Sequence, residues 1–226
     1  MSTFAQIWSG LDWSFLLDTL LSLLPALICI TLHEVSHGYA AYLLGDNTAK
    51  NAGRLTLNPI KHIDWWGLVM MALCHFGWAK PVPVDMRNFK DPKRGMAITA
   101  LAGPVANILI AIVFLFLYGL VYKPLYTGGA FAQAVLQMVG NTAYLSIALA
   151  VFNFIPLPPL DGSKVLFAFL PPRAYEWLMR YERYGMIIMV VLILTGAISG
   201  GLSTVTGWVY DKMFVFAQWG FALVVH

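Results

Sequence analysis

The residues best suited to chemistry lie in the apolar stretch Thr-Leu-His33-Glu34-Val-Ser-His37-Gly. Residues i and i+4 of a helix lie on the same face, so His33 and His37 can bind one metal ion with Glu34 beside it as a base. An amphipathic helix with solvated His and Glu is the alternative in a soluble chain. In a membrane span an ionisable side chain is costly and usually functional, so this pattern favours a metal centre.

A catalytic zinc site needs three protein ligands and one open position for water. The candidate for the third ligand is Asp161, which follows Pro156, Pro158 and Pro159. These prolines keep the segment extended until a short helix predicted over 160–170 begins. Asp161 could instead cap that helix, and the two roles are compatible. The sequence therefore predicts one Zn²⁺ per chain, with Asp161 completing the site.

Two asparagines lie in apolar surroundings where an amide needs hydrogen-bond partners. Asn107 belongs to the sequence Ala-Gly103-Pro104-Val-Ala-Asn107, and Asn153 precedes the proline-rich turn. Either could donate to the substrate backbone or to a developing oxyanion. Hydrogen bonding between helices is an equally good interpretation, as is a kink or close packing at Gly103-Pro104.

The composition excludes a soluble globular protein. Of 226 residues, 59% are apolar and 11% are charged, and the mean hydropathy is +0.72, whereas about a quarter of the residues in a soluble chain are charged. The net charge is only +3, with no basic cluster interleaved with aromatics, so nucleic acid is not an expected partner. We expect an all-α polytopic protein whose partner is the lipid bilayer.

Four apolar runs are long enough to cross a bilayer as helices, at about 20 residues each. They are residues 15–44, 96–122, 134–155 and 185–202. Shorter apolar segments, expected to be re-entrant or interfacial, are 65–78, 160–170 and 213–225.

The charges indicate an orientation. With four spans, all but two of the 14 Lys and Arg residues lie on one side, the exceptions being Lys123 and Lys212. Positive residues concentrate in cytoplasmic loops. This predicts a cytoplasmic loop at 46–94, an active site toward the cytoplasm and both termini outside it. Within the loop, 51–58 has the pattern of a short strand, and the prolines of 80–84 favour an extended chain.

Three motifs together, HEVSHG, AGPVAN and NFIPLPPLDG, resemble the site-2 protease family of intramembrane zinc metalloproteases. GRLTLNPIKHID and GWAKPVPV resemble its compact bacterial and archaeal branch, which lacks a PDZ domain. The resemblance implies that His33, His37 and Asp161 ligate zinc and that Glu34 is the catalytic base. It also implies that a strand near Arg54–Leu57 belongs to a small membrane-associated β-sheet beside the site.

The resulting functional prediction is an intramembrane zinc endopeptidase that cleaves in or near the transmembrane segments of single-span proteins, either regulatory proteins or signal-peptide remnants. An extended substrate would pair with the strand residues Arg54, Leu55, Thr56 and Leu57. The alternatives are a divalent-metal transporter and an inactive metal-binding scaffold. A transporter should carry ionisable residues along several spans, whereas the later spans contain almost none. The oligomeric state stays open.

Overall fold

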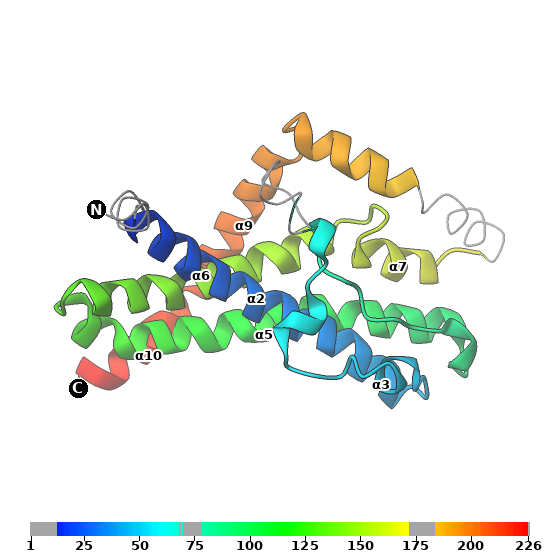
Figure 1. Ribbon diagram of the computed structural model, residues 1–226, viewed down its shortest axis with the longest axis horizontal. Coiled ribbons are helices and arrows are strands. Elements are labelled where there is room, and N and C mark those ends of the chain that lie inside the picture. The colour runs from blue at the N-terminus through cyan, green and yellow to red at the C-terminus, as the bar shows by residue number, and fades with distance from the viewer. Residues whose placement is uncertain (1–12, 68, 70–77, 172–183, 226) are drawn as a thin grey trace, which may run out of the picture.

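The computed structural model describes residues 13–67, 69, 78–171 and 184–225 of the chain. These residues form a helical bundle in which the long helices lie side by side (Figure 1). The α-helices of three turns or more with labels in Figure 1 are α2 (Trp13–Leu43), α5 (Pro92–Tyr126), α6 (Ala130–Asn153), α9 (Ser199–Met213) and α10 (Val215–Val225). Short elements are α3 (Thr48–Asn51), η1 (Pro59–His62), η2 (Met86–Asn88) and α7 (Asp161–Ala168).

Two described helices, α5 and α6, are long and apolar enough to cross a membrane. A short turn joins them, so they run antiparallel, and their interface is made of small and aliphatic side chains. Ala111 and Leu115 of α5 are fully buried against Ala143 and Ile147 of α6, and Ala217 of α10 completes this cluster. Close packing of small residues is the usual basis of helix association in membranes. The fold is therefore that of an integral membrane protein.

The predicted span at 185–202 is wrong as a single helix. One helix runs over Tyr184–Leu194, and the chain then bends by 85° before α9 begins. The turn contains Gly196 at a φ of +71°, a left-handed conformation that glycine adopts without steric cost. The described residues offer two helices apolar enough to span, or three if the bent pair counts as one. The predicted span at 15–44 is not among them, so four full spans are not supported.

The other predicted helices differ mainly at their ends. The runs at 15–44, 96–122 and 134–155 correspond to α2, α5 and α6, and the run at 160–170 contains α7. Most of 65–78 lies outside the described residues. The last run, 213–225, forms α10, which packs along α5 so closely that a Cβ at Gly119 or Gly220 would collide with the opposing backbone.

The predicted strand at Arg54–Leu57 is also wrong. Among the described residues no strand forms, and the extended backbone makes a single isolated bridge between Ile63 and Ala79. Residues 48–51 turn into α3 instead, and Gly53 then reverses the chain at a φ of +63°. The small membrane-associated sheet is thus not supported.

Side chains, rather than a neighbouring strand, satisfy the backbone of this segment. The ring Nε2 of His62 lies 2.9 Å from the carbonyl oxygen of Thr56. The Arg54 guanidinium donates to the carbonyl oxygen of Lys80 at 2.7 Å. These contacts use the acceptors that a sheet would need. The Arg54 bond, together with the backbone N–H of Lys80 that donates to the carbonyl oxygen of His62 at 2.9 Å, ties 54–62 to the extended segment 79–84. The predicted pairing of Arg54–Leu57 with substrate therefore lacks the strand on which it depended.

Asp46 fastens the other end of the extended segment. Its fully buried carboxylate accepts hydrogen bonds from the backbone N–H of Thr48 (3.0 Å), the backbone N–H of Asp85 (2.8 Å) and the side chain of Asn88 (2.7 Å). Burial alone would raise the pKa of Asp46, but these hydrogen bonds to the charged form, together with that from the Thr48 hydroxyl, lower it overall.

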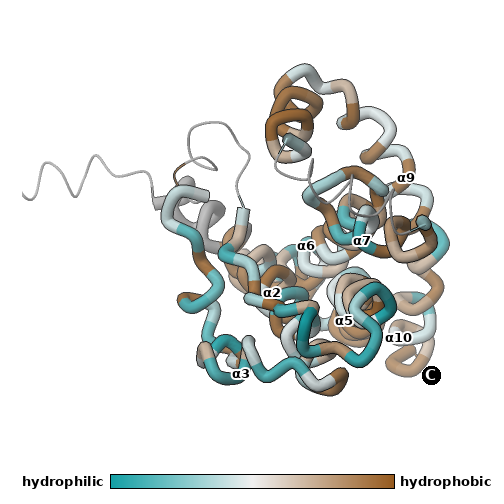
Figure 2. Tube along the Cα trace, turned by 90° about the vertical axis from the view of Figure 1, so that its right-hand side faces the viewer, coloured by the Kyte–Doolittle hydropathy of each residue, from teal (hydrophilic) through white to brown (hydrophobic). Residues whose placement is uncertain are grey.

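The residues around α3 and after it are largely hydrophilic, whereas α10 is largely hydrophobic (Figure 2).

Replacing Asp46 with Asn should destabilise the protein by about 2 kcal/mol at pH 7, because an amide supplies fewer acceptors to these donors and no charge. The pKa of Asp46 is lower in the folded state, so its contribution is present above its ordinary value of 3.8 and is lost as the pH falls through the lowered pKa. Thermal unfolding in detergent should show the gap between wild type and variant at pH 7, and the gap should shrink near pH 3.

Asp91→Asn is the matched control, since Asp91 caps α5 from an exposed position and asparagine caps equally well. Equal melting temperatures for Asp46→Asn and Asp91→Asn at pH 7 would contradict the anchoring role.

Candidate metal centre

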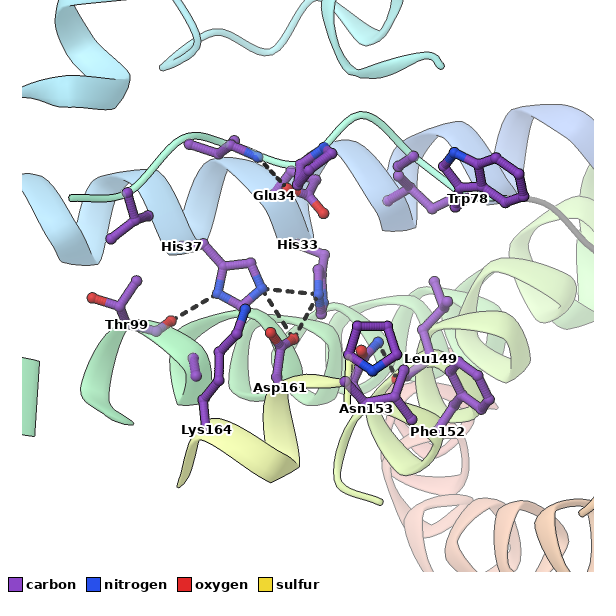
Figure 3. A pocket seen from close by; sticks show the side chains of 18 of the residues that line it. His33, Glu34, His37, Trp78, Thr99, Leu149, Phe152, Asn153, Asp161 and Lys164 are labelled. Atoms are coloured by element: carbon purple, nitrogen blue, oxygen red, sulfur yellow. Dashed lines mark hydrogen bonds and ion pairs between the residues drawn. The ribbon is translucent and has the colours of Figure 1, made fainter. Parts of the chain in front are cut away.

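Two imidazoles and one carboxylate converge between helices that are far apart in the sequence. His33 and His37 point from α2 toward Asp161, the first residue of α7 (Figure 3). The two Nε2 atoms lie 3.0 Å apart, and Oδ2 of Asp161 is 3.2 Å from that of His33 and 3.1 Å from that of His37. All three side chains are nearly buried. The atoms that could ligate a metal therefore face one common point.

This donor set fits Zn²⁺. Tetrahedral zinc with bonds of about 2.0–2.1 Å holds its ligand atoms about 3.3 Å apart, close to the separations of these three atoms. Nitrogen and carboxylate oxygen are ligands that zinc prefers, and three protein ligands leave one position for water. The other ring nitrogen of His37, Nδ1, supports an orientation with Nε2 toward the metal, because Nδ1 lies 2.7 Å from the carbonyl oxygen of Thr99 in α5. With Nδ1–H donating to that carbonyl, Nε2 is free to bind metal.

The turn before α7 explains how Asp161 reaches the site. Helix α6 ends at Asn153, and the prolines that follow prevent it from continuing. The N-cap of α7 is Leu160, and no side chain caps that helix. Capping therefore does not account for Asp161, whose carboxylate faces the histidines. Gly162 permits this approach, because a Cβ there would lie within 2.7 Å of the backbone of Ile155.

Gly103 of α5 leaves the space that the two imidazoles occupy. A Cβ at this position would collide with Nε2 of His37 and would lie 2.6 Å from Cε1 of His33. Gly103 thus forms the floor of the site, which is the close-packing role that the sequence offered for Gly103-Pro104.

Glu34 lies on the opposite side of the site, against the extended segment. The backbone N–H of Val82 donates to its Oε2 at 2.9 Å. Pro81 and Pro83 flank that N–H and have none of their own, so Val82 supplies the donor at this point. Gly38 lets the segment lie close to α2, because a Cβ there would be 2.9 Å from the Val82 side chain. The prediction that 80–84 is extended agrees with this arrangement.

A cavity of about 470 Å³ opens onto these groups. Its walls include the three candidate ligands, Glu34, Val82, Asn153 and Lys164. Asn153 donates from Nδ2 to the carbonyl oxygen of Leu149 at 3.0 Å while lining the cavity. Asn107, in contrast, is fully buried behind His33, with its Nδ2 3.1 Å from Nδ1 of that ring. The predicted roles of both asparagines toward substrate stay predictions.

Sequence reasoning missed several residues of the site. Thr99 and Val82 act through backbone atoms, which side-chain patterns do not reveal. Lys164, one turn after Asp161, lines the cavity. Its three-residue spacing from Asp161, which places the two on one face of a helix, could have indicated this position. The structure places Arg54 in contact with Lys80 rather than at the candidate ligands.

The depth of the site follows from its contacts with α5. Asn107, beside His33, lies 11 residues beyond Met96, where the apolar part of α5 begins, or about 16 Å along the axis. Thr99, beside His37, is about 12 Å nearer to the start of α5. A hydrocarbon core is about 30 Å thick. The site therefore extends from near one surface of the apolar zone toward its middle, as expected of a membrane metallohydrolase.

Comparison with known proteins agrees with this class. The profile of peptidase family M50 matches residues 120–196. YwhC of Bacillus subtilis, named as a zinc metalloprotease, is 40% identical over 181 residues, covering 77% of this chain and 83% of that protein. Rip2 of Mycolicibacterium smegmatis, named likewise, is 30% identical over 190 residues, covering 82% of this chain and 71% of that protein. No solved structure matches the chain.

The chain belongs to peptidase family M50, the site-2 protease family. This confirms the predicted family, the predicted metalloprotease class and Zn²⁺ as the cofactor.

Gly103→Ala should weaken zinc binding by about 1–3 kcal/mol, because the added methyl group pushes both imidazoles out of place. Competition with a chromophoric zinc chelator measures this affinity on the purified protein. Gly207→Ala is the control, since a Cβ at Gly207 of α9 meets no atom within 4 Å. Equal zinc affinities for the two variants would refute the role of Gly103 as the floor of the site.

Proposed function

We propose that this protein is an intramembrane zinc endopeptidase that cleaves peptide bonds in or near the transmembrane segments of single-span membrane proteins. The observation that carries the proposal is the convergence of His33, His37 and Asp161 on one point, with Glu34 in the wall of the same cavity. The names given to YwhC and Rip2, which include zinc metalloprotease, support it. Regulatory proteins and signal-peptide remnants are the proposed substrates.

His33, His37 and Asp161 would hold the zinc ion through Nε2, Nε2 and Oδ2. Bound zinc supplies a Lewis acid that makes water nucleophilic near neutral pH. Glu34 takes the proton from the attacking water and passes it to the leaving amine. Its Oε2 is held by the N–H of Val82, which leaves Oε1 to carry the proton.

The substrate must present an extended backbone at this depth. A peptide bond within a transmembrane helix is hydrogen-bonded and shielded, so the helix has to unwind before water can attack. The cavity is polar on the side of the candidate ligands and is lined elsewhere by Ile30, Leu149 and Met186. Asn153 lines the cavity, and in this proposal the second hydrogen of its amide would donate to a substrate carbonyl or to the oxyanion.

We infer that the site faces the cytoplasm and that both termini lie outside it. The positive residues of the loop 46–94 support this orientation. The start of α2 and the end of α10 also lie at the same end of the bundle, opposite α3 and α7 (Figure 1). The candidate ligands lie toward α7, and so toward the end from which α5 starts.

Glu34→Gln should lower the rate of cleavage by about 10²–10⁴-fold, because an amide cannot accept the water proton. It should leave one zinc per chain, since Glu34 is not among the three converging groups. The assay is cleavage of a model single-span protein co-reconstituted in vesicles, with zinc measured on the same sample.

Asp161→Ala is the companion variant, and it should lose both zinc and activity. Undiminished cleavage by Glu34→Gln would contradict the proposed mechanism, and zinc flux across the vesicle membrane without cleavage would favour a transporter.

Val82→Pro should lower kcat by about ten- to a hundredfold, because it removes the one N–H that holds Glu34 while keeping the chain extended. Val82→Ala keeps that N–H and loses only the side chain, so it serves as the control. Both variants should retain zinc. Equal kcat values for the proline and alanine variants would show that the hydrogen bond to Glu34 does not position the base.

A further inference from the structure

The side chain of Asn107 lies next to Nδ1 of His33, on the side of the ring opposite Nε2, which faces the candidate metal position. It is fully buried, and its Nδ2 is 3.1 Å from Nδ1 of His33. Its Oδ1 is buried without a hydrogen-bond partner. A buried amide oxygen that lacks a partner is unusual in a folded protein, so this contact calls for a physical reason.

An amide can present either its oxygen or its nitrogen to a neighbour with almost the same shape. With Nδ2 facing His33, the amide donates to Nδ1, and the neutral ring then carries its hydrogen on Nε2. That hydrogen would occupy the position where the metal binds. With Oδ1 facing His33, the amide accepts from Nδ1–H, and Nε2 has a free lone pair directed at Asp161 and His37. The amide therefore decides which tautomer of His33 is stable.

We propose that Asn107 is a positioning residue for the zinc centre: its Oδ1 accepts a hydrogen bond from Nδ1–H of His33 and keeps Nε2 directed at the metal. This proposal rests on the proposed function of His33 as a ligand. It assigns to Asn107 a role different from contact with substrate or oxyanion, since the fully buried side chain lies behind the ring.

The geometry at His37 supports the assignment. There the carbonyl oxygen of Thr99, two turns earlier on α5, accepts from Nδ1 at 2.7 Å. One helix thus contacts both rings on their outer nitrogens, once through a backbone oxygen and once through a side-chain amide. A backbone carbonyl can only accept a hydrogen bond, so His37 carries its hydrogen on Nδ1. If Oδ1 of Asn107 accepts in the same way, His33 also carries its hydrogen on Nδ1, and both rings have the same tautomer. Outer hydrogen bonds of this kind fix ligand orientation in zinc sites.

The hydrogen bond between Asn107 and α6 does not use the Asn107 side chain. The contact of α5 with α6 at this point is made by Ser146, whose buried hydroxyl donates to the backbone carbonyl of Asn107 at 2.8 Å. That bond does not involve the amide. Ser146→Ala therefore removes a buried hydrogen bond at the same place in the bundle without altering the neighbour of His33, which makes it a matched control.

The test is zinc affinity of the full chain in detergent, measured by competition with a chelator, for wild type, Asn107→Leu, Asn107→Asp and Ser146→Ala. Asn107→Leu has similar bulk but no acceptor, and it should bind zinc about 10- to 100-fold more weakly. Asn107→Asp keeps an acceptor for Nδ1–H and should restore most of the affinity. Ser146→Ala should match wild type. If Asn107→Leu does not fold, Asn107→Ala, which adds no bulk, replaces it with the same expectation.

The absorption spectrum of the Co²⁺-substituted protein gives a second readout. The ligand-field bands should change in Asn107→Leu and stay unchanged in Ser146→Ala, because only the former changes the support of a ligand. A purely structural asparagine predicts the opposite order: Asn107→Asp, which buries a charge, would be the worst variant, and the spectra would not change. That order would overturn the proposal. Absence of zinc from the wild type would instead refute the proposed function itself.

Discussion

The structure depends on the contact of one carboxylate with two imidazoles, all three nearly buried and lining the same cavity. His33 and Asp161 are 128 positions apart in the chain, yet their ligating atoms lie 3.2 Å apart. Nearly buried groups of this kind are costly unless they are paired or bind a metal. The placement of α2, α5 and α7 around that point brings three candidate donor atoms to separations close to those that zinc would need.

The surrounding elements divide this task. Helix α5 supports the rings from behind, with the space at Gly103, the carbonyl of Thr99 and the amide of Asn107. The extended segment 79–84 closes the front, where the Val82 N–H holds Glu34. Asp46, Arg54 and the backbone carbonyl of His62 in turn connect that region to the loop after α2. In this arrangement the polar loop supports Glu34, the proposed catalytic base, and the bundle supports the three candidate metal ligands.

The sequence allowed the convergence of the three candidate ligands to be predicted better than the fold. A four-residue spacing of histidines and a proline-bounded aspartate are local signals, and the structure brings His33, His37 and Asp161 together. The strand at Arg54–Leu57 could not be judged locally, because a strand needs a partner and here the acceptors of Thr56 and Lys80 are taken by side chains. The helix break after Leu194 was hidden in an apolar run, since hydropathy does not register a turn at glycine.

X-ray absorption at the zinc edge of the purified wild-type protein tests the central claim most directly. The account predicts one zinc per chain, with two imidazole nitrogens and carboxylate or water oxygens at about 2.0–2.1 Å and no sulfur ligand. A chain that purifies folded and active without zinc, or a spectrum without the scattering of two imidazoles, would contradict it.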